Sequence, residues 1–151
     1  MKFFWSKEEL EVNIAAAEKM HQIANRTTGH ESGGLLIGWW DGQSIVINDA
    51  TEVYDPTATE TSWMRREAIA QVSLDEILSK SDDEKLGYVG DWHSHPQAIG
   101  ASRTDLFSLK RASLQYARPI ALVIRLPNGT FDVHVARQGK HCKVNSNKQE
   151  R

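Results

Sequence analysis

The sequence is poor in the residues on which several common kinds of protein depend. Cys142 is the single cysteine, which excludes an internal disulfide and a Cys-x-x-Cys zinc site. No apolar run approaches the roughly 20 residues needed to span a bilayer, and charged residues follow the apolar start at residues 1–5 too soon for a signal peptide. We therefore expect a cytoplasmic protein that has no membrane partner.

An excess of one charge is also missing. The chain has 18 Lys and Arg against 20 Asp and Glu, a formal net charge of -2, so there is no electrostatic reason to expect nucleic acid as the main partner. Its 151 residues, 40% of them hydrophobic, are enough for one domain with its own core. We expect this domain to cover residues 1–138 and to be followed by a polar, flexible tail over residues 139–151.

Hydrophobic periodicity and turn signals predict the order of the elements. Ser6 and Glu9 have the spacing of a capping box, which predicts a helix that begins there and ends at Gly29. The later segments predict, in order, strands over 33–40 and 44–53 joined by an Asp-Gly turn, a loop over 54–66, a helix over 67–79, a strand over 86–95, a helix over 102–117, and a hairpin of strands over 119–126 and 130–136. This order predicts a single α/β (α+β) domain with a mixed sheet flanked by helices.

The segment around the two central histidines carries the clearest chemical signal. His93 and His95 lie two residues apart in a predicted strand, where such side chains point to the same face. Together with Asp105 they form the three-ligand set of a catalytic zinc site, which leaves a fourth position open. A single histidine more often has a packing role, and Ser102 with Asp105 also has the spacing of a helix-capping box. Both interpretations hold together if Asp105 lies in the first turn of a helix, whose dipole favours a carboxylate.

Hydrolysis also needs a group that moves protons. Glu31 is the best candidate, because it directly precedes a strand that starts with two glycines, where another backbone can approach closely. Asp91 is an alternative, because in an extended strand its side chain points to the same face as those of His93 and His95. Its position also suits a residue that orients a metal ligand. Glu52 and Glu67 remain open as further alternatives.

Taken together, these motifs resemble those of the JAMM (MPN-plus) zinc metalloproteases, with the prokaryotic JAB branch as the closest match. The resemblance covers residues 6–136 and rests on Glu31 before the glycine-rich strand, His93-Ser94-His95-Pro96 and Ser102-Arg103-Thr104-Asp105. It implies a JAB/MPN fold similar to the cytidine-deaminase-like sandwich. It also implies one Zn²⁺ per chain on His93, His95 and Asp105. Glu31 would be the general acid/base, and Ser102 would donate a hydrogen bond to the oxyanion.

The same resemblance implies a hydrolase, namely a zinc-dependent peptidase or isopeptidase similar to the deubiquitinases. Its partner would be a ubiquitin-like protein, cleaved after its C-terminal glycine during maturation or during removal from a conjugated target. Bacterial antiphage operons, which serve antiviral defence, are one expected context. The alternatives are a peptidase that processes a sulfur-carrier protein and a non-catalytic MPN-type scaffold. A zinc nucleobase deaminase is disfavoured, because its Pro-Cys-x-x-Cys motif is absent.

Several further features bear on how such a substrate would bind. Residues 97–101 form a loop one residue shorter than we expect in relatives, which affects the placement of Ser102. An extended glycine tail is most readily held by adding a strand to an exposed sheet edge. The loop over 55–66, with Trp63 and Met64, either folds over such a tail or is a surface loop with one buried aromatic. His134 and His141 are expected to be ordinary surface or packing residues.

Overall fold

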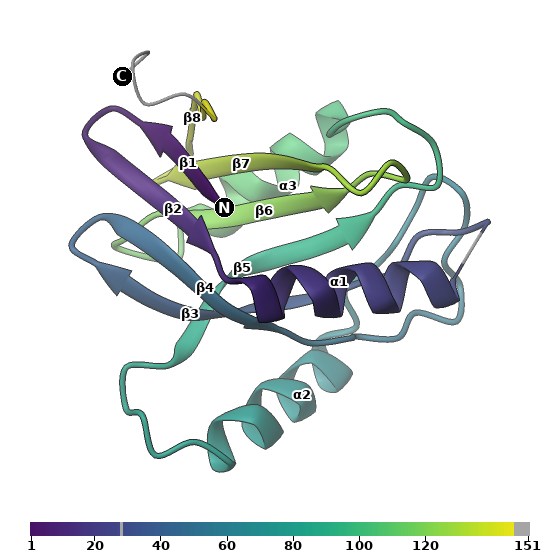
Figure 1. Ribbon diagram of the computed structural model, residues 1–151, viewed down its shortest axis with the longest axis horizontal. Helices are drawn as coiled ribbons and strands as arrows, with labels where there is room; N and C mark the ends of the chain where they lie inside the picture. Colours follow the sequence, from purple (N-terminus) through teal and green to yellow (C-terminus); the bar gives the residue numbers. More distant parts are fainter. Residues whose placement is uncertain (28, 147–151) are drawn as a thin grey trace.

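The computed structural model describes residues 1–27 and 29–146, and this part of the chain contains one mixed sheet of eight strands (Figure 1). The strands are β1 Lys2–Trp5, β2 Glu8–Val12, β3 Gly33–Asp41, β4 Ser44–Ala50, β5 Gly87–Ser94, β6 Ile120–Arg125, β7 Phe131–Arg137 and β8 Lys140–Cys142. Their order in the sheet is β1-β2-β4-β3-β5-β6-β7-β8, with parallel pairing of β2 with β4 and of β5 with β6. The helices are α1 Ile14–Arg26, α2 Glu67–Ser79 and α3 Arg103–Ser113. The predicted mixed sheet flanked by helices is confirmed.

Helices cover both faces of the sheet. Neighbouring residues of a strand point to opposite faces, so they pack against different helices. Leu36 of β3 lies in the apolar cluster that contains Met20 of α1. Its neighbour Leu35 lies in a second cluster, with Ala70 of α2. A third cluster brings Leu122 of β6 against Leu109 of α3. Accordingly, α1 lies on one side of the sheet and α3 on the other (Figure 1).

The predicted helix start at Ser6 is wrong. Ser6 has a φ of 50° and lies in the turn of a hairpin between β1 and β2. In β2, Leu10 is buried whereas its neighbours Glu9 and Glu11 are partly exposed, a period of two that fits a strand and not a helix. The helix begins only at Ile14, whose side chain is exposed.

The segment predicted to be a flexible tail also differs from that prediction. Its residues 140–142 form β8, which pairs antiparallel with β7. Asn145 then exchanges two backbone hydrogen bonds with Phe4 of β1, of 2.7 and 2.8 Å, and so links the two ends of the sheet. A polar composition gave no sign of this pairing with the start of the chain. The predicted tail residues 147–151 lie outside the described residues.

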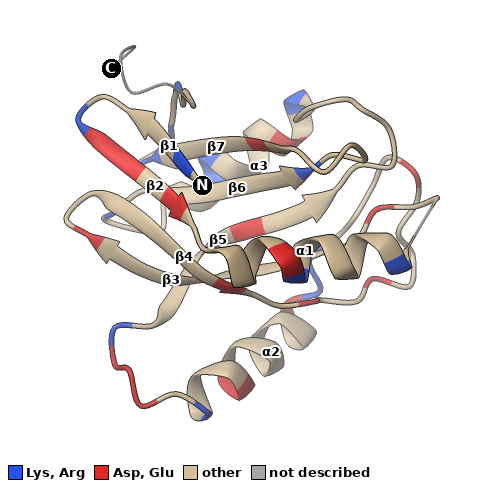
Figure 2. Ribbon diagram, in the orientation of Figure 1, with Lys and Arg blue, Asp and Glu red and all other residues tan. Residues whose placement is uncertain are grey.

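The elements that position the central histidines agree with the prediction more closely. The β3–β4 hairpin turns through Gly42, whose φ is 60°. Helix α2 has the predicted bounds. Helix α3 begins directly after Ser102 but ends earlier than predicted, at Ser113. None of the helices in the described residues is both long and apolar enough to cross a membrane. Acidic and basic residues are interspersed over strands and helices (Figure 2).

Candidate metal centre

Strand pairing brings Glu31 to the two histidines. Gly33, the first residue of β3, is the register partner of His93 near the end of β5. The pairing continues beyond the strands, because Ser94 N donates to Ser32 O at 2.8 Å and Ser32 N donates to Ser94 Oγ at 2.9 Å. Glu31, next to Ser32, therefore lies beside His93, at the same end of these two central strands. Its side chain is buried, with 5% of the residue exposed.

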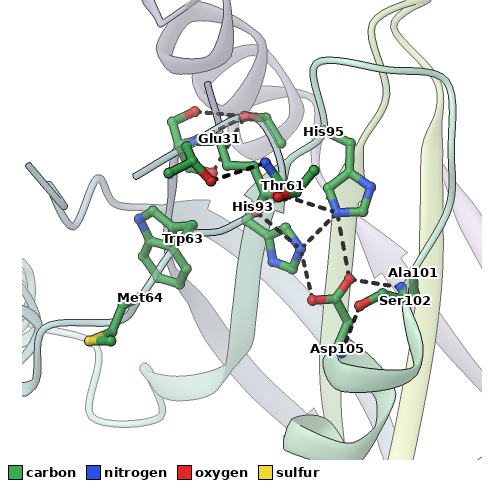
Figure 3. Close-up of polar contacts among 12 residues, drawn as sticks. Glu31, Thr61, Trp63, Met64, His93, His95, Ala101, Ser102 and Asp105 are labelled. Carbon is green, nitrogen blue, oxygen red and sulfur yellow. Dashed lines mark hydrogen bonds and ion pairs between the residues drawn. The ribbon is translucent and has the colours of Figure 1, made fainter. Parts of the chain in front are cut away.

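The two imidazoles point at a common position (Figure 3). His93 Nε2 and His95 Nε2 lie 3.1 Å apart. His95 Nδ1 lies 2.6 Å from the carbonyl oxygen of Ile99, which can only accept, so Nδ1 carries the hydrogen. In its neutral form, the ring presents the lone pair of Nε2 to the common position, as a metal ligand requires. The ring of His93 stacks on that of Trp63, with centroids 6.3 Å apart.

Two carboxylates approach these nitrogens from different parts of the chain, one before β3 and one in α3. Asp105 of α3 lies 3.4 Å from His93 Nε2 and 3.5 Å from His95 Nε2. Glu31 lies 3.9 Å from the first and 3.6 Å from the second. Ligand atoms of a tetrahedral zinc site, each about 2.1 Å from the ion, are about 3.4 Å apart. The spacing of these four side chains therefore fits a divalent cation such as Zn²⁺.

The geometry contains two donor sets that share both histidines. Glu31, His93 and His95 have ligand atoms within 4.8 Å of one another. Asp105 is closer to both imidazoles than Glu31 is, with Oδ1 nearer to His93 and Oδ2 nearer to His95, and it forms the second set with them. The predicted site residues are therefore brought together, while the division of roles between the two carboxylates is a matter of proposal.

Asp105 is held in place by the start of α3. Ser102 is the N-cap: its Oγ accepts from Asp105 N at 3.1 Å, and its backbone N donates to Asp105 Oδ2 at 2.9 Å. The predicted capping box is confirmed, and it coexists with the approach to the histidines. Burial alone would raise the pKa of Asp105, but the neighbouring imidazoles of His93 and His95 and the hydrogen bond from Ser102 N hold that pKa well below its usual range.

Glu31 lies in a different environment. Burial raises the pKa of its carboxyl group, although His93 and His95 act in the opposite direction. Its backbone N donates to Thr59 O at 2.8 Å, so the loop after β4 covers this part of the chain. Among the described residues, Glu31 and Asp105 are the only acids within 4 Å of either imidazole Nε2.

The other acids considered from the sequence are engaged elsewhere. Asp91 accepts from Arg65 Nη1 at 2.9 Å and from Tyr88 Oη at 2.7 Å. Glu67 pairs with the same Arg65 at 3.0 Å, and Glu52 pairs with an arginine of α1. Arg65 was missed in the sequence, because nothing local marks a loop arginine that reaches a strand 26 positions later.

Two cavities meet at the histidines. One, of about 390 Å³, lies on the His93 side, between Trp63 to Glu67 and α3. The other, of about 130 Å³, lies on the His95 side and is lined by Ile99 and Ser102. Asp105 lines both cavities, so an extended chain has room on either side of the four converging side chains.

Residues 14–135 match the family described as prokaryotic homologs of the JAB domain. This chain belongs to the prokaryotic JAB family. The family predicted from the motifs is thereby confirmed, and the match spans every predicted site residue of this JAB domain.

Two known proteins are similar to this JAB domain. The CD-NTase/cGAS isopeptidase of Escherichia coli strain TW11681 is 31% identical over 70 residues, an alignment that covers 46% of this chain and 45% of the relative. The JAB domain thus aligns with less than half of that relative's length. The solution structure of protein DSY2949 from Desulfitobacterium hafniense is similar with a TM-score of 0.59 at 19% identity, covering 83% of this chain and 82% of the other. At this identity the likeness concerns the fold.

Proposed function

We propose that this prokaryotic JAB protein is a zinc-dependent peptidase or isopeptidase that cleaves after the C-terminal glycine of a ubiquitin-like protein. The observation that carries the proposal is the convergence of His93 Nε2 and His95 Nε2, 3.1 Å apart, with carboxylates from two separate parts of the chain beside them. The similarity to a protein named CD-NTase/cGAS isopeptidase supports the reaction class.

In this proposal, His93, His95 and Asp105 hold one Zn²⁺. Asp105 is assigned as the ligand because it is nearer to both imidazoles than Glu31 and because the start of α3 fixes it. When bound, zinc supplies a Lewis acid that polarises the scissile carbonyl and favours loss of a proton from water.

Glu31 is the general acid/base of the proposed reaction. Its carboxylate lies on the other side of the imidazole pair from Asp105 (Figure 3) and is free of arginine or lysine ion pairs among the described residues. In this place Glu31 takes a proton from the attacking water and passes it to the leaving amine. Burial favours this role, since a carboxyl group that is not strongly hydrated exchanges protons nearer to neutral pH.

Ser102 donates a hydrogen bond to the carbonyl oxygen as negative charge develops there. Its Oγ acts as an acceptor in the helix cap, so the cap leaves the hydroxyl hydrogen available for this purpose. Ser102 lines the cavity on the His95 side together with Glu31 and Asp105, and this position supports the proposed role.

The substrate tail is assigned to the cavities beside the histidines. Trp63 and Met64 border the larger cavity opposite Leu109 of α3, so the loop over 55–66 forms one wall of the proposed binding site. Strand addition at the outer edges is less suitable, because Asn145 and Phe4 join β1 to the segment after β8. Glycine has no side chain, so a tail that ends in glycine fits between the loop and α3, the two walls of this cavity.

An isopeptide bond is the bond of a conjugate, so the similarity to a protein named an isopeptidase favours removal from a conjugated target over precursor maturation. A cytoplasmic setting in an antiphage operon fits this version of the proposal. Processing of a sulfur-carrier protein remains the second enzymatic candidate. The non-catalytic scaffold is disfavoured, because the chain has both histidines and both carboxylates in converging positions.

The test uses a ubiquitin-like protein joined through its C-terminal glycine to a reporter, once by a peptide bond and once by a lysine isopeptide bond. Zinc-loaded protein should cleave after the glycine, as located by mass spectrometry. The cleavage should stop with a chelator and return with Zn²⁺. Equal cleavage by metal-free protein would refute the proposal. A preference between the two linkages separates deconjugation from maturation.

A further inference from the structure

Asp132 of β7 connects the sheet to the loop that leads into Ser102. Its Oδ2 accepts a hydrogen bond from the backbone N of Ala101 at 2.8 Å. Asp132 is paired in register with Ile124 of β6, which is in turn paired with His93 of β5. The backbone of Asp132 therefore has a fixed place relative to that of His93, because three adjacent paired strands connect them.

The hydrogen bond from Ala101 N to Asp132 holds the C-terminal end of the loop over 97–101 against β7. Two of its hydrogen bonds stay close to the loop, one from Ile99 N to Gln97 O at 2.8 Å and one from His95 Nδ1 to Ile99 O. Gly100 allows the close approach, because a Cβ added there would lie 2.6 Å from Asp132 Oδ2. A glycine at this position thus lets a short loop lie directly against the carboxylate.

A second contact holds the carboxylate itself. His134 Nε2 lies 2.8 Å from Asp132 Oδ2, and His134 Nδ1 lies 3.1 Å from His141 Nε2. Because the carboxylate accepts, His134 carries its hydrogen on Nε2, and His141 then donates to Nδ1. The hydrogen bond from His134, followed by the one from Ala101, lowers the pKa of Asp132, so the group stays an anionic acceptor. The expectation that both histidines are ordinary surface or packing residues did not include these hydrogen bonds.

We infer that Asp132 is a positioning residue: by holding Ala101 it fixes the backbone of Ser102 and, through the capping box, the direction of the Asp105 carboxylate. The connection is short, since Ser102 follows Ala101 directly and its N–H donates to the Asp105 oxygen that lies 3.5 Å from His95 Nε2. Groups that orient a metal ligand from behind affect affinity and activity without touching the ion.

The inference rests on the proposed function for its effect on cleavage, so the primary measurement is metal binding. We expect Asp132→Ala to lower the affinity for Zn²⁺ by about 10-fold or more and to alter the visible absorption spectrum of the Co²⁺-loaded protein. Asp132→Asn keeps an oxygen that accepts from Ala101 N, and its affinity should stay within about 3-fold of the unchanged protein. In cleavage assays, Asp132→Ala should lower kcat more than it changes KM.

Two further variants keep the test decisive. His141→Ala removes only the outermost contact, and its affinity for Zn²⁺ and Co²⁺ spectrum should match those of the unchanged protein. Gly100→Ala displaces Asp132 from the other side, so it should weaken Zn²⁺ binding even if Asp132→Ala fails to fold. In the double variant with Asp132→Ala, the effect of Gly100→Ala should shrink, because the crowded oxygen is gone.

The outcomes distinguish this inference from the proposed function. An unchanged protein that binds no Zn²⁺ would overturn the proposed function and the inference together. An unchanged protein that binds Zn²⁺ and cleaves, while folded Asp132→Ala and Gly100→Ala variants bind with equal affinity and give an unaltered Co²⁺ spectrum, would overturn the inference alone.

Discussion

Gly33 and His93 are antiparallel register partners, and their pairing places Glu31 beside an imidazole that is distant in the sequence. The position of Glu31 is therefore set by the sheet and not by the flexibility of a loop. The hydrogen bonds from Ser94 N to Ser32 O and from Ser32 N to Ser94 Oγ extend this control to the residue next to Glu31. A change that disturbs the start of β3 should consequently affect both folding and the proposed reaction.

Gly34→Ala tests how closely β3 must approach its neighbour. A Cβ at residue 34 would lie 1.7 Å from the backbone oxygen of Thr51, which cannot move without distorting the chain there. We expect the free energy of unfolding to fall by about 3 kcal/mol. Gly87→Ala, in β5, is the matched control, because a Cβ there meets nothing within 4 Å. Equal stability of the two variants in urea unfolding, followed by tryptophan fluorescence, would contradict the described packing.

Ser102 is proposed to act both as a helix cap and as a donor to the substrate, and two substitutions separate these roles. Ser102→Ala should lower stability by about 1 kcal/mol, whereas Ser102→Gly should cost only a few tenths. Both lack the hydroxyl, so both should reduce kcat about 100-fold or more. If Ser102→Gly retains nearly full activity, the residue serves only to cap α3.

Asp55 is a buried carboxylate that holds the loop over the larger cavity. Its oxygens accept hydrogen bonds from Thr57 N at 2.9 Å, Met64 N at 2.8 Å and Arg66 Nη2 at 3.0 Å. Burial on its own would raise the pKa of Asp55, but these hydrogen bonds outweigh it and hold the pKa well below its usual range. Stability from this group is thus present above the unfolded-state pKa of about 3.9 and is lost as the pH falls toward the folded-state value.

Asp55→Asn should therefore destabilise the protein at pH 7 by about 1–3 kcal/mol, since the NH₂ group of the new amide would face a hydrogen-bond donor such as Met64 N. The difference from the unchanged protein should shrink as the pH falls below about 4. Asp82→Asn is the control, because Asp82 is exposed. Urea unfolding at several pH values measures the effect, and a difference that stays constant between pH 7 and pH 3 would refute it.

The site could be predicted from the sequence because its signals are local. His93 and His95 share a strand face through a period of two, and Ser102 with Asp105 marks a helix start through a spacing of three. Glu31 was found through the glycines that follow it. No local pattern predicts that Glu31 lies close to the histidines, because the pairing of β3 with β5 creates this proximity.

The errors at the two ends of the chain have the same physical origin. The spacing of Ser6 and Glu9 suits a capping box, yet Leu10 gains burial only by pairing with Ile45 of β4, far along the sequence. Asn145 likewise pairs with Phe4, and neither partner predicts the other. Local propensity was overridden by contacts that only the folded sheet provides.

The thiol of Cys142 is not part of the proposed chemistry. It lies in β8, packs against the apolar cluster on the α1 side, and burial raises the pKa of its thiol. Cys142→Ser should therefore keep its cleavage activity, and that activity should still be abolished by a chelator. A variant that loses activity while retaining its zinc content and its melting temperature would indicate a thiol mechanism.

The division of roles between the two carboxylates is tested most directly by measuring bound zinc and cleavage rate together in Glu31→Gln and Asp105→Asn. Each substitution keeps the size of the side chain, and the asparagine preserves an acceptor for Ser102 N. We predict that Glu31→Gln retains one zinc per chain and loses activity by about 1,000-fold or more, while Asp105→Asn loses zinc and activity together. Retention of zinc by Asp105→Asn with its loss from Glu31→Gln would contradict the account, because Glu31 would then be the ligand.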